Sequence, residues 1–326
     1  MNVSSRCEYK DPEGNQCECE AGDSGLCYWH DPQVAKDDPD LADKLEQYAR
    51  SGGMLKGIYL IRANLQGINL VRHGCSEGFD MSGADLYRAD LRGAHLFNLN
   101  LRGGSLMKAD LRDANVHCAQ LQYCNLLGAR WEGAKIENID VGKRVRQETE
   151  AIDAERRKER EEANDLYQQA EEIYRDLRKA AEFAGIFAMS GYFIQRELTV
   201  RRYRMPRLST GRILSKIVDL FCGYGEAPSR VVIFSMILIL ICAMAYFFTG
   251  LDYSGEVQQF SWDNGFASNL ATFGGCLYYS VVTFTTLGYG DFIPIGFSRV
   301  IAALEAFIGS FTMALFVVVF VKKMTR

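Results

Sequence analysis

An apolar residue recurs at every fifth position through most of residues 58–143. Leu86, Leu91, Leu96, Leu101 and Leu106 form one unbroken series, which continues to residue 141. A small residue often stands two positions before the apolar one, with Asp or Asn between them. An α-helix repeats every 3.6 residues and a strand every two, so neither accounts for this pattern. The segment therefore requires a fold whose building unit is five residues long.

Quintets such as Ala84-Asp85-Leu86-Tyr87-Arg88 resemble the pentapeptide-repeat family. The resemblance implies a right-handed quadrilateral β-solenoid in which four quintets make one coil and the small and central residues point inward. About seventeen quintets predict four coils or slightly more, with Leu60, Leu65, Leu70 and Cys75 as central residues before an extra residue near Gly78 shifts the frame. The repeats contain about as many arginines as acidic residues. A protein that imitates DNA would be acidic, so this balance argues against DNA mimicry and favours a rigid scaffold or subunit-contact module.

Residues 1–40 contain five candidate metal ligands: Cys7, Cys17, Cys19, Cys27 and His30. No signal peptide precedes them, so we expect a reducing compartment, in which cysteines bind metal more often than they form disulfides. Thiolate and imidazole ligands suit Zn²⁺. The segment resembles small bacterial cysteine-rich zinc modules, which implies Cys7, Cys17, Cys27 and His30 as ligands and Cys19 as the alternate. Incidental cysteines or a redox sensor are the other interpretations.

Helices are predicted on both sides of the repeats. Residues 41–57 read as a linker helix, and 144–207 as a charged helical linker. Its polar run 144–162 suggests a solvated spacer, whereas an apolar stripe from Leu166 onward predicts a hairpin with its turn at Gly185 or Gly191. Residues 208–228 predict an amphipathic interfacial helix. Four basic residues before it are expected to contact anionic lipid: Arg201, Arg202, Arg204 and Arg207.

Residues 229–326 predict a membrane domain, because 230–250 and 297–321 are apolar and long enough to span a bilayer. A shorter apolar segment, 271–285, lies between them. Basic residues precede the first span and follow the second. The connection between the spans, over residues 250–275, has acidic residues but no Lys or Arg. The positive-inside rule therefore predicts cytoplasmic N- and C-termini. The net charge of −4 argues against nucleic-acid binding.

The sequence Thr285-Thr286-Leu287-Gly288-Tyr289-Gly290-Asp291 follows the short apolar segment directly. A dehydrated cation needs oxygen ligands, which successive backbone carbonyls supply only if alternate residues adopt conformations that glycine tolerates. One chain forms only one wall of such a path, so four chains must converge.

This stretch resembles the potassium-channel signature, with Leu287 in the usual Val position, and the order of spans resembles the two-transmembrane, ion-channel-2 type of prokaryotic channel. The resemblance implies a homotetramer in a bacterial or archaeal plasma membrane, with K⁺ selectivity carried by Thr286, Leu287, Gly288, Tyr289 and Gly290. Thr285, Asp291 and Tyr279 are expected to support this filter. Val282 stands where some members have a glutamate, so we expect Asp291 to find another partner, Tyr279 being the candidate.

Four residues of the second span are candidates for gating. Gly309 is either a bending point or a small residue for close packing. Glu305 is expected behind the filter or in the upper cavity, because a carboxylate in a span needs water or a partner. Phe316 and Phe320 form an inner constriction or face lipid.

Three functions are consistent with these features. The first is a K⁺ channel gated by its cytoplasmic parts through an unidentified ligand or protein. The second is a K⁺ leak pore with a passive scaffold. The third is a membrane-anchored scaffold or sensor with a non-conducting pore. No nucleophile–base pair, phosphate loop or catalytic carboxylate pair is present, so an enzyme is not expected.

Overall fold

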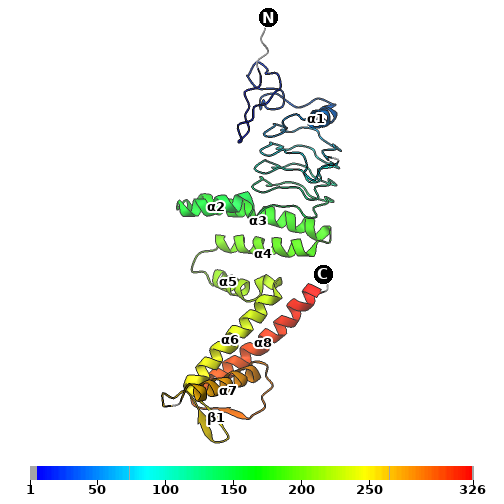
Figure 1. Ribbon diagram of the computed structural model, residues 1–326. Coiled ribbons are helices and arrows are strands. Elements are labelled where there is room, and N and C mark those ends of the chain that lie inside the picture. Colours follow the sequence, from blue (N-terminus) through cyan, green and yellow to red (C-terminus); the bar gives the residue numbers. More distant parts are fainter. Residues whose placement is uncertain (1–5, 73, 264, 325–326) are drawn as a thin grey trace. The chain divides into compact units, whose positions relative to one another are not determined.

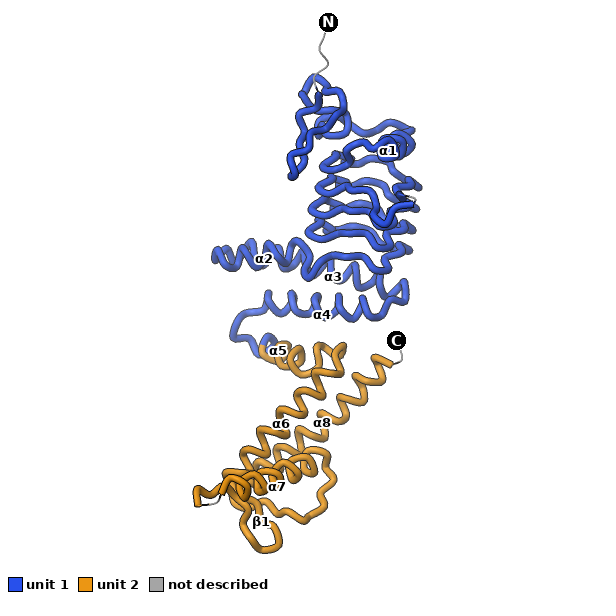
Figure 2. Tube along the Cα trace, viewed as in Figure 1, with its two compact units in different colours: residues 1–212 blue, residues 213–326 orange. Residues whose placement is uncertain are grey.

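The computed structural model describes residues 6–72, 74–263 and 265–324. It divides into two compact units, Met1–Arg212 and Ile213–Arg326, shown in different colours in Figure 2. Unit 1 contains the cysteine-rich segment, the repeats and most of the polar helices. Unit 2 contains both long apolar helices.

The five-residue repeats form stacked coils joined by short parallel bridges (Figure 1). From Asp80 onward the bridged residues are twenty apart, for example Asp80 with Asn100 and Asp90 with Asp110, so four quintets make one coil. The central leucines and the small residues two before them are buried, for example Leu86 and Ala84. This confirms the predicted pentapeptide-repeat solenoid.

The first coil is longer than the regular ones. Tyr59 pairs with Asp85, twenty-six positions later, so this coil holds six extra residues rather than one. Cys75 is exposed, whereas Leu70 and Met81 are buried. The prediction of Cys75 as a central residue was therefore wrong, because the frame changes before it.

Helix α1 (Leu41–Arg50) occupies the first part of the predicted linker helix. Its buried residues Leu41, Leu45 and Ala49 belong to the same apolar core as the solenoid leucines. The Glu46 carboxylate accepts the backbone N–H of Asn69 at 2.7 Å. The helix therefore covers the first coil.

Three helices follow the solenoid: α2 (Arg146–Arg156), α3 (Arg160–Phe183) and α4 (Phe187–Arg204). The predicted solvated spacer was wrong, because α2 packs against α3 and buries Ala151, Ala154 and Glu148. The Gln147 amide donates to the Asn125 side chain at 2.7 Å, which ties α2 to the solenoid. Gly185, at φ 71°, makes the turn between α3 and α4.

Helix α5 (Thr210–Cys222) begins at the end of unit 1, and most of it belongs to unit 2. Unit 2 also holds a 3₁₀ turn (Gly223–Gly225) and the helices α6 (Pro228–Thr249), α7 (Phe266–Phe284) and α8 (Ser298–Met324). Helix α7 begins five residues before the predicted short segment, and it packs against both α6 and α8. Strands β1 (Leu251–Tyr253), β2 (Glu256–Gln258) and β3 (Phe292–Pro294) pair antiparallel in the order β2-β1-β3. Within the described residues, α6 and α8 are long and apolar enough to cross a membrane.

Candidate functional site

The segment after α7 has an alternating backbone. Thr286, Gly288 and Gly290 have φ angles of 57°, 58° and 78°. A Cβ on either glycine would meet no atom of this chain within 4 Å, so the conformation, rather than space within the chain, demands glycine there. Sequence reasoning expected the two glycines but not Thr286, because residues with a Cβ rarely adopt positive φ.

The end of α7 holds this segment in place. The backbone N–H of Leu287 donates to the Val282 carbonyl at 3.0 Å, and that of Thr286 donates to the Thr283 carbonyl at 3.0 Å. The side chains of Leu287 and Tyr289 are 60% and 67% exposed in the single chain. They are therefore available for contacts that one chain does not make.

Asp291 is not partnered by Tyr279 within the chain. Its carboxylate lies beside the hydroxyl of the preceding tyrosine, Tyr278, and accepts the backbone N–H of Phe292 at 3.1 Å. Tyr279 is buried and its hydroxyl interacts with Thr283. The two tyrosines differ because successive helical residues point about 100° apart. Tyr279 instead lines a cavity of about 260 Å³ behind Thr286, Gly288 and Gly290.

Gly309 lies where α8 crosses the end of α7. A Cβ added to it would sit 2.2 Å from the carbonyl oxygen of Phe284, the last residue of α7. Helix α8 continues from Ser298 to Met324 as one helix. Of the two predicted roles, close packing is the one this contact supports.

Glu305 of α8 is buried where α6, α7 and α8 meet. Tyr246 of α6 donates to one carboxylate oxygen at 2.6 Å, and Ser280 of α7 lies 2.5 Å from the other. The Glu305 carboxylate therefore lies inside this helix packing, bonded to side chains of α6 and α7. Tyr246 and Ser280 were missed from the sequence, although polar atoms in apolar helices are a signal for buried hydrogen bonds.

Replacing Glu305 by Gln is expected to loosen this contact. Glutamine has one acceptor oxygen where the carboxylate has two, so one hydroxyl must rotate to a weaker partner. We expect the free energy of unfolding of the membrane domain to fall by about 1–3 kcal/mol, with slower ion flux. Thermal unfolding in detergent and flux from liposomes measure both, with the exposed Glu161→Gln, which lies outside the membrane domain, as the control. Unchanged stability and flux in Glu305→Gln would refute the role.

The two aromatic gating candidates lie one turn apart near the end of α8. Their rings are 5.7 Å apart between centroids. Phe316 packs beside Cys222, Val231 and Val319, whereas Phe320 is 45% exposed. Phe316 is thus directed towards its own chain, and an inner constriction stays a prediction.

The cysteine-rich segment gathers its ligands in one place. The donor atoms of Cys7, Cys17, Cys27 and His30 all lie within 4.8 Å of one another, and all four residues are buried. The Sγ atoms of Cys17 and Cys27 are 3.8 Å apart. Tetrahedral zinc with Zn–S bonds of 2.3 Å requires about 3.8 Å between sulfurs. Cys19 lies outside the cluster, with its Sγ 3.3 Å from the Tyr48 hydroxyl.

The surroundings of the cluster fit a cation with sulfur and nitrogen ligands. Burial lowers the pKa of His30, which favours the neutral imidazole that binds metals. Burial raises the pKa of Cys17 and Cys27, so their thiolates need a nearby positive charge, which a metal ion supplies. The Nδ1 atom of His30 faces the cysteine sulfurs. Its Nε2 atom lies 3.0 Å from the Lys56 carbonyl oxygen, and this contact orients the ring. This cluster is therefore suited to hold a metal such as zinc.

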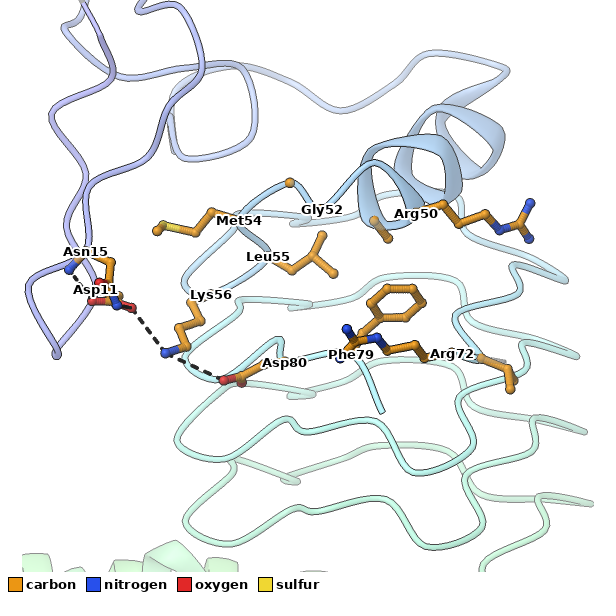
Figure 3. A pocket seen from close by; sticks show the side chains of 13 residues that line it. Asp11, Asn15, Arg50, Gly52, Met54, Leu55, Lys56, Arg72, Phe79 and Asp80 are labelled. Carbon is orange, nitrogen blue, oxygen red and sulfur yellow. Dashed lines mark hydrogen bonds and ion pairs between the residues drawn. The ribbon is translucent and has the colours of Figure 1, made fainter. Parts of the chain in front are cut away.

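Lys56 also connects the cysteine-rich segment to the solenoid. Figure 3 shows its amine between Asp11 and Asp80, at 3.1 and 3.7 Å. Glu13 is a third partner at 2.5 Å. Hydrogen bonds from Asn15, with help from Lys56, lower the pKa of Asp11 to about 2. Lys56 also lines a cavity of about 670 Å³, and its positive charge there is compensated by the carboxylates of Asp11, Glu13 and Asp80.

Several arginines of the predicted lipid contact have partners inside unit 1. Arg201 and Arg204 pair with Glu171 at 2.9 and 2.8 Å, and Arg207 pairs with Glu155 at 3.2 Å. Lipid contact by these residues and Arg202 stays a prediction.

Comparisons with known proteins identify two families. Residues 236–326 match the family profile described as ion channel, and residues 80–113 match the profile described as pentapeptide repeats (8 copies). Among solved structures, a pentapeptide repeat protein from the cyanobacterium Cyanothece 51142 is 29% identical, over 26% of this chain and 54% of its own, with a TM-score of 0.24. One from Nostoc PCC 7120 is 31% identical, over 32% of this chain and 80% of its own, with a TM-score of 0.20.

The chain thus spans about half the length of the first of these solved proteins. The comparison with curated proteins found no match. Neither matched family consists of enzymes, and the channel domain together with the two apolar helices indicates a membrane protein. The chain therefore joins a domain of the two-transmembrane ion-channel family, over residues 236–326, to a pentapeptide-repeat domain.

Proposed function

We propose that the chain is one subunit of a tetrameric, potassium-selective channel of a bacterial or archaeal plasma membrane. The observation that carries the proposal is the alternation of positive φ at Thr286, Gly288 and Gly290 between a half-spanning helix and a spanning one. Alternating conformations turn successive carbonyls towards one side, where they replace the water shell of K⁺. One chain supplies one wall, and exposed Leu287 and Tyr289 leave room for contacts with neighbours.

Electrostatics supports the same function. Helix α7 ends at the filter segment, so the partial negative charge of its C-terminus favours a cation there. The connection over residues 250–275 contains Asp252, Glu256 and Asp263 but no Lys or Arg. This acidic segment faces the outside in the proposed orientation, with both termini in the cytoplasm, and attracts cations to the mouth. Zinc at the cysteine cluster stabilises the cytoplasmic part, and anionic lipids contact the basic residues before the spans.

Ion selectivity tests the proposal directly. Full-length protein reconstituted into liposomes is expected to carry K⁺ at least tenfold faster than Na⁺, and to run as four copies in native mass spectrometry. Gly290→Ala is expected to lose this selectivity, because alanine disfavours the positive φ that the filter requires. Equal Na⁺ flux in the native protein, or another number of copies, would overturn the proposal.

The cytoplasmic part is tested by comparing the full chain with one that lacks residues 1–142. A changed K⁺ flux indicates gating by the removed part. Unchanged flux indicates a leak pore with a passive scaffold. No flux from either protein indicates a membrane-anchored scaffold with a non-conducting pore.

A further inference from the structure

A second cavity lies in the helical part of unit 1, where the turn between α2 and α3 meets the end of α4 and the residues that follow it. Its volume is about 690 Å³, within the range of small-molecule sites. Six basic side chains line it, with Glu155 as the one carboxylate of the lining: Arg156, Lys158, Arg160, Arg204, Arg207 and Arg212.

The six basic residues fall into two groups. Three are ion-paired: Arg156 with Asp153, Arg204 with Glu171, and Arg207 with Glu155. Lys158, Arg160 and Arg212 have no carboxylate within ion-pair distance in the described part of the chain. The Arg212 guanidinium donates to the carbonyls of Tyr203 and Met205 at 3.4 and 2.8 Å, which hold it without neutralising it. The cavity therefore keeps an excess of positive charge.

The backbone at Lys158 is unusual for a lysine. Its φ angle is 68°, immediately after the end of α2, a position that glycine commonly takes. Lys158 thus places a positive charge at the cavity from a backbone conformation that favours glycine. Replacing Lys158 by glycine therefore removes the charge without straining the backbone.

Aromatic rings form part of the same wall. Tyr167 and Tyr203 lie 5.3 Å apart between centroids, inclined at 47°. Both line the cavity, and Tyr203 is 36% exposed. The wall thus offers the exposed part of the Tyr203 ring beside the cations that have no carboxylate partner.

We propose that this cavity binds a phosphate ester, with Lys158, Arg160 and Arg212 contacting the phosphate and Tyr203 contacting the group attached to it. Arginine and lysine are the side chains that bind phosphate best, and a ring or acyl-glycerol group suits the tyrosine face. This chemistry is shared by soluble nucleotides and by the headgroups of anionic phospholipids. The site does not depend on the channel activity proposed above.

The conformation of Lys158 provides a matched pair of variants. Lys158→Gly removes the charge at a backbone position that glycine prefers. Lys108→Gly makes the same change on the solenoid, where the lysine is also exposed and has a φ of 58°. Arg160→Gln and the exposed Arg62→Gln extend the pair to two matched double variants. Circular dichroism melting of all four confirms that they remain folded.

Binding is measured by calorimetry on the full-length protein in detergent, with ATP, inorganic pyrophosphate, and short-chain, water-soluble phosphatidylglycerol or phosphatidylcholine as the probes. We expect Lys158→Gly to weaken binding about fivefold, and the double variant with Arg160→Gln about twenty-five-fold, because each basic residue near a phosphate contributes a similar factor. The Lys108 and Arg62 variants should stay within twofold of the native protein.

Each outcome decides the proposal. Loss that is confined to the Lys158 variants supports it, and the probe that binds, soluble phosphate or anionic short-chain lipid, names the source of the ligand. Equal weakening in both pairs would show only diffuse charge attraction and would overturn the site. Failure of every probe to bind at millimolar concentration would overturn it as well. Channel flux enters none of these measurements, so failure of the channel proposal is separately visible.

Discussion

Gly309→Ala is expected to abolish K⁺ flux from liposomes. The added methyl group would sit 2.2 Å from the Phe284 carbonyl oxygen, at the end of the helix that leads into the filter. Backbone atoms on both sides leave no flexible side chain to yield, so α8 must move away from α7. Such overpacking costs about 1–3 kcal/mol and displaces the filter segment that α7 holds. Flux and thermal unfolding in detergent measure the two consequences.

Gly274→Ala is the matched control, because Gly274 lies within α7 and an added methyl group there meets no atom of the chain within 4 Å. Its alanine should fold and conduct at near-native rates. If Gly309→Ala conducts as well as Gly274→Ala, the close contact does not hold the pore, and Gly309 has to be explained as a bending point or not at all.

The second large effect is expected at the cysteine cluster. Native protein purified without chelator should hold one zinc per chain, and Cys27→Ser should hold none. Cys27 is buried and its Sγ is 3.1 Å from the His30 ring nitrogen, so its loss leaves the remaining ligands without a fourth partner. Structural zinc supplies much of the folding energy of so small a segment, and residues 6–40 should then become sensitive to protease. Metal analysis and limited proteolysis give the readouts.

Cys19→Ser provides the comparison, because Cys19 lies outside the cluster and contacts Tyr48 instead. It should retain zinc and protease resistance. Loss of metal in Cys19→Ser alone would exchange the roles of the two cysteines, whereas native protein without any metal would refute the site.

Local patterns in the sequence were sufficient for much of this architecture. The five-residue period requires a solenoid because every coil buries the same kind of residue. The prediction of which residues are buried was wrong only in the first coil, which holds six extra residues. The glycines at positions 288 and 290 indicated the filter because backbone conformation depends on the residue itself. The ligands Cys7, Cys17, Cys27 and His30 were chosen through a resemblance, since spacing alone left five candidates.

Contacts between distant segments could not be predicted in the same way. The charge of the run over residues 144–162 predicts a solvated spacer. In the structure Glu148 of α2 is buried against Arg196 of α4 and Tyr174 of α3, so its charge is compensated by elements distant in sequence. Charge along one helix does not reveal such partners.

Sequence alone determined the repeating coil, the two long apolar helices and the glycines with positive φ at positions 288 and 290, because each depends on residues close together in the chain. Only the tertiary structure decided that Gly309 meets the end of α7, that Glu305 bonds to Tyr246 and Ser280, and that six basic residues line one cavity. Those arrangements depend on which faces of separate helices meet, and many pairings of faces bury similar apolar area. The physical reason is that burial is non-directional, whereas hydrogen bonds and close contacts are specific to one packing.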